Sequence, residues 1–321
     1  MEYTSRNARV ISRLGGCGAF GMAALELAEE YENFAVLTAD LCTYSGLDRF
    51  AEKYPQYLYN LGIAEQNMVG VAAGMAKEGM NVFATTYASF AATRTCDQIR
   101  VNMGYMKFPI KLIGLTAGLT VGILGATHIA LEDVAIMRSI PNITVISPAD
   151  GFETIKAVKE AAKMQTPVYI RLTGSMNAPI VYHEDYEFKI GKMITLRSGA
   201  DVSIFATGTM VHECLKAADL LHEQGIEVCV VDVHTIKPLD KETVKKVFSA
   251  SKLIVTAEEH SIIGGLGSAI ADYKAQYECA PKLIKIGIKE EFPHAASYEY
   301  LLKQHGLTSS QIAQRILEEL N

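Results

Sequence analysis

Short apolar runs alternate with longer amphipathic patterns along the chain. In the first half, apolar runs predict strands at residues 34–40, 57–65, 81–87, 110–116, 143–150 and 167–173. Helical patterns fall between them, at residues 18–31, 45–55, 66–79, 94–106, 130–141 and 151–164. Strands that alternate with helices predict a mostly parallel sheet with helices on its faces.

The alternation weakens between residues 174 and 197, where we expect an interdomain connection with hairpin-like strands. It then resumes to the C-terminus as a second, smaller α/β pattern. A chain of 321 residues also exceeds what one core usually holds. We therefore predict two mostly parallel α/β domains, at residues 1–175 and 198–321, joined by a linker at 176–197.

Composition narrows the class of protein. The net charge of −6 offers no basic surface for nucleic acid. Six scattered cysteines without a CxxC pair predict reduced thiols in a cytoplasmic protein and no zinc site. The uncharged run at 112–131 contains several Gly and Thr and one His, so we expect a strand, a loop and a helix start instead of a membrane span. The N-terminus lacks the pattern of a signal peptide.

Glu65 stands out within a stretch that looks buried. It is the only formal charge between Tyr59 and Ala76, where a short strand passes into a helix rich in Gly and Ala. Burying a carboxylate costs several kcal/mol unless it has a partner. Glu65 is either a first-turn acid, stabilised by the helix dipole by about 0.3–1 kcal/mol, or a group that faces a ligand.

Five segments of the sequence favour the second alternative, in which Glu65 faces a ligand. In the same order along residues 10–315, they resemble segments of thiamine-diphosphate enzymes of the transketolase group: "GIAEQNMVGVAAGMA", "FATTYASFAATRTCDQIR", "AGLTVGILGATHIALEDVAIMRSIPNITVISPAD", "VDVHTIKPLD" and "AEEHSIIGGLGSAIAD". The resemblance implies a pyrimidine-binding domain followed by a transketolase C-terminal domain.

The resemblance assigns Glu65 to the cofactor. Thiamine diphosphate acts by ionising a thiazolium carbon to an ylid that adds to carbonyl groups. The cofactor's own amino group takes this proton as the imino tautomer, which a carboxyl group on the pyrimidine ring nitrogen favours by proton exchange. Glu65 is expected to supply that carboxyl as a catalytic and cofactor-binding residue, with the cofactor as its partner.

Four further residues take roles from the resemblance. Tyr87 and Phe90 are expected around the aminopyrimidine, although their spacing alone suits a core pair. Asp40 is expected near the thiazolium, or else as an Asx turn or helix N-cap. His128, expected at the start of a helix, is predicted to contact donor oxygens in the substrate channel. His234 and His260, in the second domain, are weak catalytic candidates.

One part of such an enzyme is missing from this sequence. The diphosphate site of the group carries a Gly-Asp-Gly triplet, which does not occur here. The resemblance therefore implies a second subunit that holds the diphosphate and its Mg²⁺ or Ca²⁺, with no metal site in this chain. It also implies a dimer of this chain flanked by two partner chains, an α2β2 assembly.

The substrate channel departs from the family pattern. Cys17 and Gly174 stand where phosphate-binding arginines are usual, Ile123 and Leu124 replace an acidic pair, and Thr116 replaces a histidine. Losing charged donors removes strong contacts to a phosphate. We expect a substrate without a phosphate, or a phosphate held by the partner subunit.

The sequence thus predicts the small subunit of a split transketolase (EC 2.2.1), which moves a two-carbon ketol unit from a ketose to an aldose. One alternative is the β subunit of a 2-oxoacid dehydrogenase or a deoxyxylulose-phosphate synthase-like enzyme. "HTIKPLD" and the aromatic segment favour transketolase. The second alternative is a non-catalytic scaffold subunit, against which the joint presence of Glu65, Tyr87 and Phe90 argues.

Overall fold

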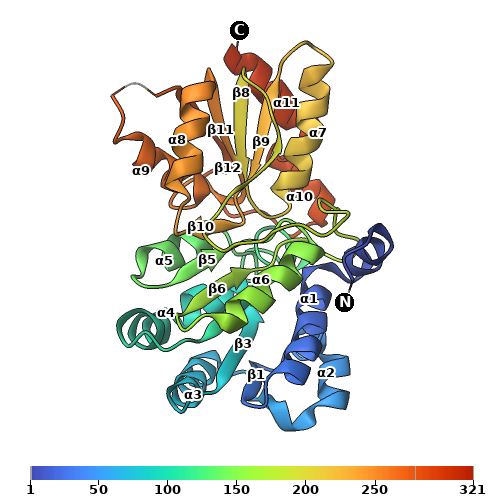
Figure 1. Cartoon of the computed structure of the whole chain (residues 1–321), viewed down its shortest axis with the longest axis vertical. Coiled ribbons are helices and arrows are strands. Elements are labelled where there is room, and N and C mark those ends of the chain that lie inside the picture. Colours follow the sequence, from blue (N-terminus) through green and yellow to red (C-terminus); the bar gives the residue numbers. More distant parts are fainter. Residues whose placement is uncertain (1, 279, 321) are drawn as a thin grey trace.

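Two sheets, each covered by helices, lie one above the other along the long axis of the molecule (Figure 1). The computed structural model describes residues 2–278 and 280–320. The first domain is built from the N-terminal half of the chain and the second from the C-terminal half. The predicted fold class, two mostly parallel α/β domains, is confirmed.

The first sheet has seven strands in the order β10-β5-β6-β4-β3-β1-β2. All of its pairings are parallel except that of β10 with β5. Strands β1 and β3 are buried at every position, as expected for parallel strands covered on both faces. The N-terminal strands are β1 (Phe34–Thr38), β2 (Leu58–Asn60), β3 (Asn81–Tyr87), β4 (Lys111–Leu115), β5 (Thr144–Ile146) and β6 (Val168–Arg171).

Helices cover both faces of this sheet and build two separate apolar clusters. Helix α1 packs along α6 on one face. Helices α3 and α5 both contribute buried residues to the apolar cluster on the other face. The helices of this domain are α1 (Ser5–Glu30), α2 (Asp48–Lys53), α3 (Glu65–Lys77), α4 (Cys96–Ile99), α5 (Asp133–Ser139) and α6 (Gly151–Lys163). Short 3-10 turns lie at Thr43–Ser45, Pro55–Tyr57 and Gly122–Leu124.

Helix α1 is the one helix in the described part of the chain that is long and apolar enough to cross a membrane. Half of its apolar window is buried within the domain. Its backbone leaves helical geometry at Gly15, where φ is +70°. The run at 112–131 is not a helix: it holds the end of β4, a loop and a 3-10 turn.

Two sequence predictions in this domain need correction. The predicted helix at 94–106 is a mixed segment, in which α4 is flanked by π-helical turns at Phe90–Arg94 and Arg100–Tyr105. His128 does not begin a helix, because α5 starts at Asp133. His128 lies instead in the loop that follows the 3-10 turn at Gly122–Leu124.

The second sheet has five strands in the order β12-β11-β8-β9-β7, with β7 antiparallel to β9. Its strands are β7 (Ile194–Arg197), β8 (Val202–Ala206), β9 (Val228–Asp232), β11 (Leu253–Ser261) and β12 (Lys282–Ile288). Its helices are α7 (Met210–His222), α8 (Lys241–Ala250), α9 (Leu266–Lys274), α10 (Tyr298–Gln304) and α11 (Ser309–Leu320). Helices α7 and α8 lie on opposite sides of this sheet (Figure 1).

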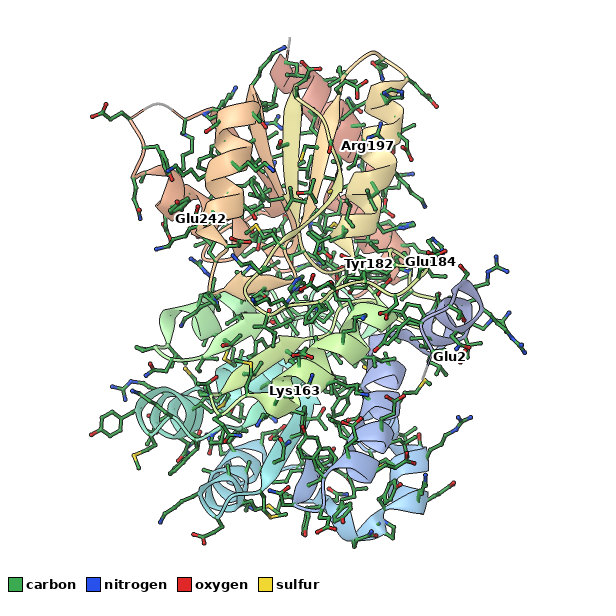
Figure 2. All side chains as sticks on the ribbon, in the orientation of Figure 1. Glu2, Lys163, Tyr182, Glu184, Arg197 and Glu242 are labelled. Carbon is green, nitrogen blue, oxygen red and sulfur yellow. The ribbon has the colours of Figure 1, made fainter. Side chains whose placement is uncertain are left out.

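The two domains share structure at their junction. Strand β10 (Thr235–Lys237) follows β9 of the second domain but pairs with β5 of the first sheet. The expected hairpin-like strands are absent: residues 174–193 contain no strand, and β7 joins the second sheet. Tyr182 lies in this connection, where the domains meet (Figure 2), and its hydroxyl donates to Asp232 at 2.7 Å.

A buried ion pair also ties the domains together. Arg171 Nε donates to Asp133 at 2.8 Å, and both side chains are almost fully buried. Arg171 Nη2 donates to the carbonyl of Glu259, in the second domain, at 2.6 Å. Breaking a buried pair by removing one partner typically destabilises a protein by about 3–5 kcal/mol. These residues therefore fix the orientation of the two domains.

Candidate cofactor and active site

The C-terminal ends of four neighbouring parallel strands meet at one edge of the first sheet. Ligands of open α/β sheets gather at this edge, where the strands run out into loops. Tyr87 is the last residue of β3, while Glu65 and Thr116 follow the ends of β2 and β4. Asp40 follows the end of β1, and Asn60 ends β2. The sheet therefore collects side chains that lie up to 76 positions apart in the sequence.

Glu65 is buried and has a protein partner. Its side chain is 4% exposed, and Arg94 Nη1 donates to its Oε1 at 2.6 Å. The sequence prediction placed only the cofactor opposite this carboxylate, so Arg94 is an addition to that prediction. Among the described residues, no donor reaches Oε2. One oxygen is thus held by a guanidinium, while the other remains able to bind a further group.

A π-helical turn brings Arg94 to Glu65. The segment Phe90–Arg94 follows β3 directly and is wound as a π-helix, a form that often occurs at functional sites. The Arg94 guanidinium carbon lies 4.0 Å from the centre of the Phe90 ring. Gln66 Nε2 donates to the Arg94 carbonyl at 3.0 Å. The arginine is therefore fixed by a ring on one side and by helix α3 on the other.

Three rings form a cluster beside this ion pair. The centre of the His128 ring lies 5.4 Å from that of Tyr87 and 5.1 Å from that of Phe90. Tyr87 and Phe90 are 5.8 Å apart, and all three contacts are edge-to-face, a favoured geometry for aromatic pairs. Burial raises the pKa of Tyr87, and neighbouring Tyr44 and Cys17 act in the same direction. The predicted residues Tyr87, Phe90 and His128 are thus brought into contact with one another.

Asp40 lies on the same edge of the sheet and is held by an asparagine. Asn60 Nδ2 donates to the Asp40 carboxylate at 3.0 Å, and the Asp40 N–H donates to Asn60 Oδ1 at 3.1 Å. The φ of Asp40 is +60°, in the left-handed region that Asp tolerates better than most residues. Asp40 is not a helix N-cap, because Cys42 precedes the next 3-10 turn and Leu47 precedes α2. The reciprocal contact fixes the carboxylate at the end of β1.

The positions that depart from the family pattern also lie together. A Cβ on Gly15 would come within 2.6 Å of the Ser175 carbonyl, so the kink of α1 touches the segment that follows β6. Gly174 is in that segment, and its N–H donates to Thr120 at 3.0 Å. Burial raises the pKa of the Cys17 thiol to about 11, partly opposed by a hydrogen bond to the Thr116 backbone. At neutral pH this position therefore carries a neutral thiol and no charge.

Thr116 was noted in the sequence only as a replacement. It has a φ of +48°, which is strained for a β-branched residue, and its buried hydroxyl has no hydrogen-bond partner in the described chain. Backbone strain and an unsatisfied polar group both mark functional sites. Arg94, Asn60 and Tyr44 were not predicted as site residues. The quoted segment "FATTYASFAATRTCDQIR" contained Arg94, but nothing in its spacing pointed to Glu65.

The two histidines singled out in the second domain, His234 and His260, are both buried. His234 is fully buried, and burial lowers its pKa to about 4, so the ring is neutral. Its ring centre lies 4.3 Å from that of Phe188. His260 accepts a hydrogen bond from the Ala135 N–H at 3.4 Å across the domain junction. Within residues 2–278 and 280–320, no group of three or more His, Cys, Asp or Glu side chains is arranged to hold a metal ion.

Comparison with known families identifies both domains. Residues 17–177 match the transketolase pyrimidine-binding domain, and residues 191–312 match the transketolase C-terminal domain. The chain belongs to the transketolase family. It spans only these two domains of a transketolase, as the sequence predicted.

Two relatives of this transketolase chain are separate subunits. A 6-deoxy-6-sulfo-D-fructose transketolase subunit from Clostridium sp. (strain MSTE9) is 40% identical over 290 residues, which are 90% of this chain and 89% of that protein. An apulose-4-phosphate transketolase subunit from Phocaeicola vulgatus is 35% identical over 301 residues, 94% of this chain and 96% of that protein.

A solved structure supports the same assignment. It is described as a split gene transketolase, inactive beta4 tetramer, and is 39% identical with a TM-score of 0.88. The match covers 95% of this chain and 98% of that one. Because the chain spans nearly the whole of these subunits, its recognition as the small subunit of a split transketolase is confirmed.

The transketolase residues present here fit a thiamine cofactor. A flat heteroaromatic ring with a basic nitrogen needs an acid in a dry pocket and ring walls, which Glu65 and the Tyr87–Phe90 pair provide. The unpartnered Thr116 hydroxyl at the neighbouring strand end offers a further polar contact. The fit concerns the pyrimidine half of the cofactor, which is the part that Glu65, Tyr87 and Phe90 would contact.

Proposed function

We propose that this chain is the catalytic small subunit of a thiamine-diphosphate-dependent transketolase that transfers a two-carbon ketol unit from a ketose to an aldose. The observation that supports this most directly is the buried Glu65 carboxylate. Arg94 holds one of its oxygens and the other is left without a protein donor among the described residues. Burying a carboxylate costs free energy unless it has partners, so the unused oxygen is available to a further group.

The residues of this chain have distinct tasks in that reaction. When bound, thiamine diphosphate supplies a carbanion that adds to carbonyl groups. Glu65 Oε2 would exchange a proton with the pyrimidine ring, and Arg94 fixes the carboxylate through its hydrogen bond to Oε1. Tyr87 and Phe90 exclude water from that ring. His128 binds substrate oxygens, and Asp40 lies near the reacting carbon.

A second subunit completes the site under this proposal. It carries the diphosphate-binding domain and holds Mg²⁺ or Ca²⁺, and two copies of each chain form an α2β2 assembly. Helix α3 offers a surface for the contact between copies of this chain. Gly70 and Gly74 are exposed on it one turn apart, and a Cβ on either would meet nothing within 4 Å. Another helix can therefore approach this face closely.

The substrate end of the channel favours a ligand other than the usual sugar phosphates. Cys17 is uncharged and Gly174 has no side chain, while Ile123 and Leu124 are 76% and 45% exposed in the adjoining loop. These residues offer apolar contact and no charged donor. An anionic group on the substrate, such as the sulfonate or phosphate in the relatives' names, would then be bound by the partner subunit.

Reconstitution tests the proposal. The purified chain alone is expected to bind thiamine diphosphate weakly and to show no turnover, while the mixture with its partner consumes a ketose donor. Calorimetry with cofactor and Mg²⁺ measures the first, and light scattering measures self-association. Sub-micromolar cofactor binding by the chain alone would contradict the split site.

The same mixture separates the alternatives. Preference for pyruvate over a dihydroxyacetone-unit donor would favour a 2-oxoacid dehydrogenase or a deoxyxylulose-phosphate synthase-like activity. An assembled complex that binds no thiamine diphosphate would instead indicate a scaffold subunit.

A further inference from the structure

The edge of the first sheet opposite the active site contains a polar cavity of about 400 Å³. It lies between the first residues of β3 and β4 and the C-terminal ends of α1 and α6. Its lining includes Tyr31, Asn81, Lys111, Lys163 and Gln165. Lys163 lies at the end of α6, in the first domain (Figure 2). The five residues of β4 separate this cavity from Thr116 in the active site.

Lys111 is the unusual residue of this cavity. It is 2% exposed, and among the described residues no hydrogen bond or ion pair reaches its ammonium group. The side chain is buried along most of its length, but the ammonium nitrogen is not one of the fully buried polar atoms, so the group is accessible where the side chain lines the cavity. Burial lowers the pKa of Lys111 to about 8, and burial is the only cause of that shift. At neutral pH the group is still mostly a cation.

Asn81 adds an unsatisfied acceptor to the same cavity. Its Nδ2 donates to the carbonyl of Ala162 at 2.9 Å, which fixes the orientation of the amide. Its Oδ1 is buried and has no partner among the described residues. Lys111 lies beside Phe83 in register, and Phe83 is two residues after Asn81, so the three side chains share one face of the sheet. The starts of these two strands therefore carry one donor and one acceptor without a partner among the described residues.

Neighbouring groups provide no partner for the Lys111 ammonium. The helix ends above the cavity would favour a cation, but the Ala161 and Ala162 carbonyls at the end of α6 are already hydrogen-bonded. No Asp or Glu of the described chain lines the cavity. The other lining cation, Lys163, has its own partner, Glu160, at 2.5 Å. The cavity as a whole therefore lacks an anion.

We propose that this cavity binds a small oxyanion, a carboxylate or a phosphate. Its charge pairs with the Lys111 ammonium, which lines the cavity. Tyr31 and Gln165 lie at the wall for further hydrogen bonds. The site is independent of the proposed ketol transfer, since it lies at the other end of the strands.

Thermal unfolding of the full chain, titrated with inorganic phosphate or with glycerate at constant ionic strength, tests the proposal. A ligand that binds only the folded state raises the midpoint in a saturable way. Lys111→Met should weaken the apparent affinity at least tenfold, and the matched control Lys163→Met should change it by less than twofold. Binding should weaken as the pH rises above about 8, because the ammonium group then loses its proton.

The two probes distinguish the source of the anion. Saturation by phosphate alone assigns a phosphate site, saturation by glycerate alone assigns a carboxylate site, and saturation by both assigns a general oxyanion site. If Lys111→Met does not fold, acylation of Lys111 in the wild-type chain, followed by mass spectrometry, replaces it. A bound anion should slow that acylation and leave acylation of Lys163 unchanged.

Three results would overturn the proposal. One is the absence of a saturable effect of either probe on both unfolding and acylation. Another is an equal effect of the probe on wild type and Lys111→Met. The third is loss of probe binding when the partner subunit is added, because the cavity would then be part of the subunit interface.

Discussion

Replacing Arg94 by glutamine should slow proton transfer at the cofactor without removing it. Glutamine retains an N–H donor for Glu65 but carries no charge. The carboxyl group then loses the charged partner that holds its Oε1 in place. Cofactor binding should change little, because Arg94 touches Glu65 and Phe90 and the proposed diphosphate site lies on the partner subunit.

The size of the effect follows from the geometry of the pair. A hydrogen bond to a charged group contributes about 1.5–3 kcal/mol. Glu65 is buried, but the Arg94 side chain is 43% exposed, so solvent screens part of the interaction. We expect about 1–2 kcal/mol, which corresponds to a loss of about 5–30-fold in rate at 1.4 kcal/mol per tenfold.

The assay is the exchange of the cofactor's thiazolium proton with solvent deuterium in the assembled complex. Arg94→Lys should recover part of the rate, because it restores the charge without the planar donor geometry. Arg94→Gln should cost little in a Glu65→Gln background, since residues that act through one contact are not additive. Calorimetry of cofactor binding to each variant controls for a loss of assembly.

Two outcomes would refute this reasoning. Exchange by Arg94→Gln within twofold of wild type would show that the ion pair does not act on the proton. A full 5–30-fold loss by Arg94→Gln in the Glu65→Gln background would show that Arg94 acts elsewhere.

Three further predictions follow from individual residues. Glu65→Gln should lower the same exchange rate by about 10²–10⁴-fold with an unchanged circular dichroism spectrum, and a rate within tenfold of wild type would make Glu65 structural. Lys111→Met should stabilise the chain at pH 7 by about 3 kcal/mol, because the folded-state pKa of about 8 lies below the ordinary value of about 10.4. The cost of burying the charged lysine is complete below pH 8 and fades toward pH 10. In urea unfolding, the free energy of unfolding of the wild type should therefore approach that of the variant as the pH rises over this range. A difference that stays constant with pH would contradict this prediction. Ketose phosphates should not be preferred over unphosphorylated ketoses, since two missing charge-assisted contacts at Cys17 and Gly174 correspond to about 10²–10⁴-fold; a more than hundredfold preference in kcat/KM would show that other cations bind the phosphate.

The sequence alone determined the architecture and most of the residues at the site. Strands such as β1 and β3 are covered on both faces, so most of their positions are apolar, and such a run is recognisable from the local sequence alone. The order of the segments identified the family and singled out Glu65, Tyr87, Phe90 and His128. The structure brings the rings of the last three into contact, while the roles of all four residues stay predictions.

Only the tertiary structure decided which side chains meet. Arg94 lies 29 positions from Glu65 and reaches it because a π-helical turn follows β3, and local periodicity carries no information about that distance. Strand β10 pairs with the first sheet although its neighbours in sequence build the second. Lys111 opens an apolar run and looks like a solvated strand end. It is buried, and the residues around it come from the ends of α1 and α6 and the start of β3. None of these segments within the described chain supplies an acid for its charge, and local sequence does not reveal which segments meet there.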